Sequence, residues 1–143
     1  MKAEESKVNK PVAVLDTNMY ISAAFWSGEP YLVVQKAITQ EIISFISQEI
    51  VQELREVLAR DFNIGKEDIE EIVKAVFFFT HLTEPKEKVS IIKDDPDDDG
   101  ILECALACKA NFVVTRDKHL LKLKEFRGIK IVTPKEFLRI LES

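Results

Sequence analysis

The sequence has only two cysteines and two histidines. Cys104 and Cys108 are four residues apart in a helical pattern, and no second pair of ligands completes a zinc site around them. We therefore interpret both as small buried residues of a protein in a reducing compartment. Long hydrophobic runs are also missing, because no apolar stretch approaches the roughly 18 residues that a transmembrane helix requires. These absences argue against a zinc protein and against a membrane protein.

The N-terminal stretch MKAEESKVNKP is polar and contains no apolar segment of the kind found in signal peptides. We expect a flexible tail over residues 1–10 and, together with the free cysteines, a cytoplasmic location. Internal repeats and low-complexity segments are absent as well. The length of 143 residues predicts one domain, over residues 11–143, with a sizeable core.

Charge is distributed unevenly along the chain, although the net charge of −5 argues against a nucleic-acid partner at first sight. Residues 1–108 carry 11 basic and 21 acidic groups, whereas residues 109–143 carry 9 basic and 4 acidic groups. A basic block of this kind either meets phosphates or forms a solvated face, and charge alone does not decide between these readings.

Short runs rich in β-branched residues alternate with helical patterns, which predicts a three-layer α/β/α sandwich around a mainly parallel sheet. Strands are expected at residues 12–15, 42–46, 89–92, 112–114 and 129–132. Helices are expected at about residues 30–40, 48–61, 67–79, 98–109, 117–123 and 134–141. In such sheets, ligands bind beyond the carboxyl ends of the strands.

Two of the predicted strands end on the same type of residue. Asp16 follows the strand VAVL directly, and Asp117 comes shortly after the strand FVV. One such aspartate is usually a turn residue or a helix cap. Two at the same edge of one sheet suggest a shared site.

The stretch IKDDPDDDG places five carboxylates in six residues, from Asp94 to Asp99. Ile101, Leu102 and Ala105 follow Asp98 at helical spacing, so Asp98 should lie along the buried face of that helix at its first turn. Asp99 should lie about 100° round the helix, nearer solvent. A helix cap explains one of these acids but not five, and like charges this close repel each other unless a cation lies among them.

Glu53 is the fourth candidate. The apolar stripe of the helix SQEIVQELREVL comprises Ile50, Val51, Leu54, Val57 and Leu58, and Glu53 is the acid closest to it. A glutamate at the edge of a stripe is usually a surface ion-pair partner. With Asp16, Asp98 and Asp117, however, it makes four oxygen donors from separate segments. Such a set suits Mg²⁺ or Mn²⁺ acting on phosphate esters.

At these residues the sequence resembles the PIN-domain family of metal-dependent ribonucleases, over about residues 12–141. The resemblance is carried by VAVLDTNMYISA, by the glutamate in SQEIVQEL and by DPDDDGILECALACKANFVVTRDKHLL. The most similar subgroup contains toxins of toxin–antitoxin pairs, whose third motif reads Asp-Pro-x-Asp-Asn and aligns with residues 95–99.

The resemblance implies a Mg²⁺ or Mn²⁺ site made by Asp16, Asp98 and Asp117, with Glu53 bound directly or through water. Asn18 matches a residue that hydrogen-bonds to a ligand. The remaining positions with an implied supporting or alternative role are Thr115, Asp95 and Asp99. Helical phase favours Asp98 over Asp99 as the third acid.

The last motif departs from the family pattern at two positions. Arg116 replaces a usual glycine, and with Lys118 it could contact RNA phosphates or could lie in solvent. His119 replaces a usual second aspartate, and we expect it to pack or to sit exposed. This change leaves open whether the site holds one metal ion or two.

With these residues, the resemblance implies an endoribonuclease that hydrolyses phosphodiester bonds in single-stranded RNA. The subgroup implies a toxin with a small antitoxin partner, and no membrane partner is expected. A homodimer is expected as well, because the three adjacent aromatics of residues 77–79 cannot all face one core. The alternatives are a catalytically silent RNA-binding or scaffold module and a housekeeping RNA-processing nuclease.

Overall fold

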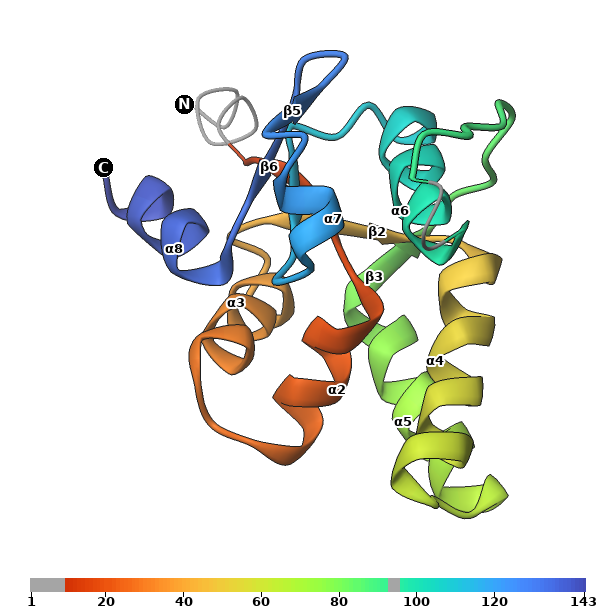
Figure 1. Ribbon diagram of the computed structural model, residues 1–143. Helices are drawn as coiled ribbons and strands as arrows, with labels where there is room; N and C mark the ends of the chain where they lie inside the picture. The colour runs from red at the N-terminus through yellow and green to blue at the C-terminus, as the bar shows by residue number, and fades with distance from the viewer. Residues whose placement is uncertain (1–9, 93–95) are drawn as a thin grey trace.

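A six-stranded sheet forms the centre of the protein (Figure 1). The computed structural model describes residues 10–92 and 96–143. The strands are β1 (Val12–Leu15), β2 (Ile43–Ile46), β3 (Thr80–Leu82), β4 (Phe112–Val114), β5 (Glu125–Phe126) and β6 (Ile129–Val132). Across the sheet they lie in the order β3-β2-β1-β4-β6-β5. Neighbouring strands are parallel, except that β5 is antiparallel to β6.

Strand β1 lies in the middle of the sheet, between β2 and β4. Its residues Ala13, Val14 and Leu15 are completely buried. A strand is buried to this extent when helices cover both faces of the sheet, which is why its apolar run is continuous rather than alternating. Because β1 and β4 are parallel neighbours, the residues that follow them emerge at the same edge of the sheet.

Seven helices surround the sheet in the described part of the chain. They are α2 (Thr17–Phe25), α3 (Glu29–Ile38), α4 (Gln48–Phe62), α5 (Lys66–Phe79), α6 (Pro96–Ala107), α7 (Lys118–Leu121) and α8 (Pro134–Glu142). Helix α6 packs against β1, β2 and β4, while α3 and α8 contact each other on the opposite side of the sheet (Figure 1). The predicted α/β/α arrangement with a mainly parallel sheet is confirmed.

Helix α4 begins immediately after β2. The hydroxyl of Ser47 accepts a hydrogen bond from the Ile50 backbone N–H at 3.2 Å, as expected of a residue that caps a helix N-terminus. The helix ends at Phe62, and the next residue, Asn63, has the left-handed backbone conformation common just after a helix. The buried stripe of α4 contacts α2, α5 and α6. This packing fixes the side of α4 on which Glu53 lies.

The strand predicted at residues 89–92 is wrong, because the edge strand is β3, immediately after α5. Carboxylates of α6, rather than a neighbouring strand, accept hydrogen bonds from backbone N–H groups of this segment. Glu103 Oε2 accepts from the Val89 N–H at 2.8 Å. Asp99 Oδ1 accepts from the N–H groups of Ile91 and Ile92 at 3.0 and 2.9 Å. We call residues 89–92 the strap.

The three adjacent phenylalanines at the end of α5 face different surroundings. Phe79 packs against the core with its ring 6.3 Å from that of Tyr20. Phe77 is 39% exposed and Phe78 is 88% exposed. Exposed aromatic rings of this kind suit an interface, so the homodimer stays a prediction.

No helix in residues 10–92 or 96–143 is long and apolar enough to cross a membrane. The tail predicted over residues 1–10 lies outside the described residues, except for Lys10.

Candidate metal centre

Asp16 and Asp117 meet at the carboxyl edge of the sheet. The Asp16 backbone N–H donates to the carbonyl of Val114 at 3.2 Å, so the two strand ends are side by side. The hydroxyl of the completely buried Thr115 donates to Asp16 Oδ2 and accepts from the Asp117 backbone N–H at 2.9 Å. Thr115 therefore joins the two acids, in a supporting position consistent with the sequence prediction.

Each of these two aspartates also begins a helix. Asp16 Oδ1 accepts from the Met19 N–H at 3.1 Å and caps α2. Asp117 Oδ1 accepts from the N–H groups of His119 and Leu120 at 2.8 and 3.3 Å and caps α7. Helix capping thus orients both carboxylates, as the ordinary role of aspartate after a strand would require. Capping leaves room for further contacts, because each carboxylate has two oxygens with two lone pairs each.

Asp98 comes from the first turn of α6, on the face that packs against β1 and β4. It is only 7% exposed. Among the residues that the structure describes, none donates a hydrogen bond to its buried Oδ2, although Asp98 makes other contacts. Helical phase therefore predicted the burial of Asp98 correctly.

Glu53 reaches the site from α4. Its Oε1 accepts a hydrogen bond from the Thr17 hydroxyl at 2.5 Å, and Thr17 directly follows Asp16. This hydrogen bond connects the Glu53 side chain on α4 to the first turn of α2. Glu53 is thus held toward the carboxyl edge of the sheet rather than extended into solvent.

A small cavity brings the predicted residues together. Its volume is about 40 Å³, which is room for a few water-sized particles. The lining residues are Asp16, Thr17, Asn18, Glu53, Asp98, Ile101 and Asp117. All four predicted acids and Asn18 therefore lie around one cavity, although they come from β1–α2, α4, α6 and the loop after β4.

The electrostatic cost of this arrangement is visible at Asp16. The pKa of its carboxyl group is raised from 3.8 to about 6, mainly by burial and also by the nearby charge of Asp117, against the hydrogen bonds from Thr115 and Met19 that lower it. Carboxylates that are buried together repel one another, and a bound cation relieves this repulsion. The set of oxygen donors fits a hard divalent ion such as Mg²⁺ or Mn²⁺.

Asp99 does not lie at the cavity, where an alternative metal ligand would have to lie. Its Oδ1 holds the strap through Ile91 and Ile92. The neighbouring residues Asp98 and Asp99 therefore have different surroundings, because Asp98 lines the cavity and Asp99 holds the strap. Asp95, the other alternative ligand, lies outside the described residues.

Replacing Asp99 by alanine should release the strap without removing a cavity residue. We expect the free energy of unfolding to fall by about 1–2 kcal/mol, because two backbone N–H groups lose a charged acceptor. Urea unfolding of Asp99→Ala and of Asp99→Asn tests this. The asparagine variant keeps an acceptor oxygen, so it should retain most of the stability. Equal losses in the two variants would contradict the assignment.

The basic candidates lie at the rim. Arg116 and Lys118 flank Asp117 in sequence and are exposed. The Arg116 Nη2 atom is 4.0 Å from Glu29 Oε1, a distance at the limit of an ion pair. A contact that weak and exposed contributes little, so Arg116 can exchange it for a phosphate.

His119 is closer to the acids than the sequence suggested. Its side chain is 46% exposed, yet its Nδ1 is 3.6 Å from Asp117 Oδ1. One potential ligand atom from each of Asp98, Asp117 and His119 lies within 4.8 Å of the others. Sequence reasoning could have found this residue by its spacing, because it stands two residues after Asp117, in the short helix that Asp117 caps.

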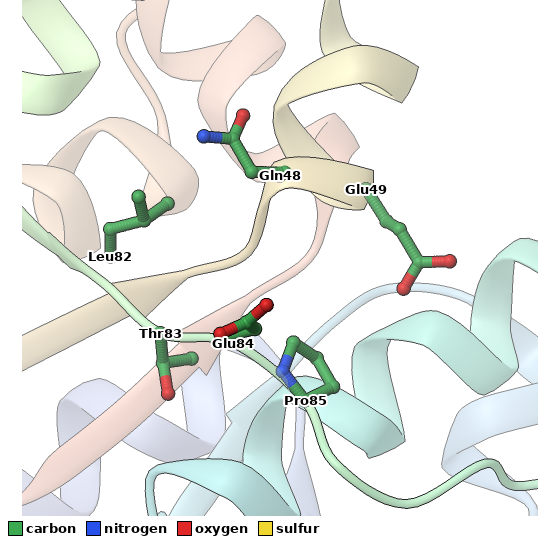
Figure 2. A pocket seen from close by; sticks show the side chains of 6 residues that line it. All are labelled: Gln48, Glu49, Leu82, Thr83, Glu84 and Pro85. Atoms are coloured by element: carbon green, nitrogen blue, oxygen red, sulfur yellow. The ribbon is translucent and has the colours of Figure 1, made fainter.

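A larger cavity of about 420 Å³ lies near the ends of β2 and β3. Figure 2 shows its six lining side chains, with Gln48 and Glu49 from the first turn of α4 and the others from Leu82 to Pro85. Within the described ranges, the group of potential metal ligands made by Asp98, Asp117 and His119 shares two residues with the acidic cavity and none with this larger one. The chemistry therefore points to the smaller cavity.

Comparison with known proteins identifies the family and supports the fold. A family model described as PIN domain matches residues 12–119. The chain is also similar to a chain in the crystal structure of VapBC2 from Rickettsia felis bound to a DNA fragment from their promoter. The two are 16% identical with a TM-score of 0.62, over 85% of this chain and 98% of that one. No curated protein gives a significant match.

Proposed function

Because the chain belongs to the PIN-domain family, we propose that it is a metal-dependent endoribonuclease that hydrolyses phosphodiester bonds in single-stranded RNA. The observation that carries this proposal is the convergence of Asp16, Glu53, Asp98 and Asp117 on one cavity. Those acids come from four separate segments of the chain. Carboxylates on an ordinary solvated surface repel one another and are not expected to line one cavity.

The metal ligands in this proposal are Asp16, Asp98 and Asp117, with Glu53 bound directly or through water. A bound Mg²⁺ or Mn²⁺ supplies an activated water and neutralises charge on the scissile phosphate. The protein's own part is to hold the carboxylates in place before substrate arrives. Thr115 positions Asp16, and Thr17 positions Glu53.

The RNA backbone would meet the rim of the cavity. Arg116 and Lys118 are exposed beside Asp117 and are suited to contact phosphates on either side of the scissile bond. Asn18 lines the cavity and is exposed, so its amide can hydrogen-bond to a ligand water or to the phosphate. Single strands fit this site better than duplexes, because a scissile phosphate must approach acids recessed in a small cavity.

Removing the metal should abolish cleavage. We expect incubation with a chelator to slow the hydrolysis of labelled single-stranded RNA by about a thousandfold, because metal activation supplies several kcal/mol to such reactions. Excess Mn²⁺ or Mg²⁺ should restore the rate. Gel electrophoresis of the products measures both effects.

A substrate with a 2′-deoxy substitution distinguishes the proposed activity from that of contaminating ribonucleases. When water is the nucleophile, no 2′,3′-cyclic phosphate forms, so a single 2′-deoxy substitution at the cleaved position should leave the rate nearly unchanged. Metal-free ribonucleases that use the 2′-hydroxyl would cut in chelator and fail on the substituted RNA. Chelator-resistant cleavage would contradict the proposal.

The same assay separates the alternative functions. Binding of Mn²⁺ and RNA without cleavage would identify a catalytically silent RNA-binding or scaffold module. The toxin role is supported by the similarity to a chain of the VapBC2 structure, and it implies a small antitoxin partner. If the chain is a toxin, its expression should arrest growth and a small DNA-binding protein encoded beside it should reverse the arrest. A housekeeping RNA-processing nuclease would show neither effect.

A further inference from the structure

The ring of His119 lies close to the carboxylate of Asp117. The His119 backbone N–H donates to Asp117 Oδ1 at 2.8 Å, which fixes the start of α7. The ring Nδ1 is 3.6 Å from the same oxygen. That distance is too long for a hydrogen bond, yet it brings a nitrogen ligand to the acid.

Asp98, Asp117 and His119 form the group of potential metal ligands in the described part of the chain, with one ligand atom of each within 4.8 Å of the others. Two ligands on opposite sides of a Mg²⁺-sized ion are about 4.2 Å apart. A small rotation of the side chains is therefore enough to close the three atoms around one ion. Asp98 is buried and His119 is half-exposed, so the imidazole would cover the solvent side of the ion.

We propose that His119 supplies a ring nitrogen to the metal, and that this mixed carboxylate–imidazole set makes the site favour Mn²⁺ over Mg²⁺. The inference rests on the proposed metal-dependent function. Its physical reason is the ligand chemistry, since imidazole binds transition-metal ions well whereas Mg²⁺ prefers oxygen. A histidine also removes one negative charge from a crowded group of acids.

Pulsed electron paramagnetic resonance of bound Mn²⁺ tests the inference directly. An imidazole nitrogen on the ion produces a ¹⁴N modulation that carboxylates and waters do not. The sequence has only two histidines, so in untagged protein the signal comes from His119 or His81. His81 lies on β3 with its ring 5.4 Å from that of Phe45, outside the group of ligands around Asp98.

Three proteins are compared with Mn²⁺ at about pH 8, where imidazole is neutral. The wild type and His81→Gln should show the ¹⁴N modulation, and His119→Asp should bind Mn²⁺ without it. By calorimetry, the Mn²⁺-to-Mg²⁺ affinity ratio of His119→Asp should fall about tenfold. His119 is half-exposed on a short helix, and circular dichroism should show an unchanged fold in this variant.

The failure of this inference differs from the failure of the proposed function. Mn²⁺ bound to the wild type without ¹⁴N modulation would overturn the role of His119 and leave the metal-dependent nuclease standing. A modulation that persists in His119→Asp and disappears in His81→Gln would overturn it equally. If the wild type binds no divalent ion, both proposals fall.

Discussion

Asp98→Asn is expected to reduce metal-dependent RNA cleavage by at least about a thousandfold while the protein stays folded. Asparagine has nearly the same shape, so the packing of α6 on β1 and β4 is preserved. It carries no charge, however, and it removes a buried acid from the cavity. A metal held by fewer anionic oxygens binds more weakly, and the lost stabilisation of the reacting phosphate corresponds to roughly 4 kcal/mol.

The matched control is Asp99→Asn, the same change one position along the helix. Asp99 holds the strap, and an asparagine oxygen can still accept from the N–H groups of Ile91 and Ile92. We therefore expect single-turnover cleavage within a few-fold of the wild type for Asp99→Asn. If Asp99→Asn is inactive and Asp98→Asn is active, the third acid has been assigned to the wrong residue.

Asp16→Asn should make the metal-free protein more stable at neutral pH, even though it should also be inactive. The folded protein raises the pKa of Asp16 to about 6 through burial and the charge of Asp117. Ionising this group therefore destabilises the folded state as the pH rises through that value. A shift of about two pH units corresponds to at most about 3 kcal/mol. We expect a gain of roughly 1–2 kcal/mol, below this upper limit.

The sign of this effect is checked by changing the pH. Urea unfolding in chelator should show the full difference above about pH 6. The difference should shrink as the pH falls and be nearly gone below about pH 3, where Asp16, with an ordinary pKa of 3.8, is protonated in both states. Saturating Mn²⁺ should reverse the order, because the ion stabilises only the protein that binds it. If Asp16→Asn is less stable than the wild type in chelator at neutral pH, the charge of Asp16 does not destabilise the folded state.

Sequence reasoning predicted the convergence of the candidate acids better than it predicted the edge of the sheet. Asp16 and Asp117 were found because parallel strands deliver their following residues to one edge, a rule that needs no side-chain detail. Asp98 was found because helical phase decides which of several adjacent acids is buried. Both arguments depend only on regular backbone geometry.

The misses have a common physical origin, because they depend on which partner satisfies a backbone or side-chain group. Val89-Ser90-Ile91-Ile92 has the composition of a strand, yet its N–H groups bond to acids on α6. Strand β3 and helix α2 were not predicted either. Thr80-His81-Leu82 is short and directly follows a helix, and the residues after Asp16 were interpreted only as a motif. His119 was judged as a single residue, although its spacing of two residues from Asp117 could have indicated that the two side chains lie close together.

The separate tasks of Asp98 and Asp99 make the rotation of α6 about its own axis critical. Each step along a helix turns the side chain by about 100°, and Ile101, Leu102 and Ala105 are buried with Asp98. A one-residue slip that moved Asp99 into the place of Asp98 would therefore turn these apolar side chains away from the core. It would also take the acceptor of the strap away from Ile91 and Ile92. Two adjacent acids are thus no substitutes for each other, and one helix register serves both the cavity and the strap.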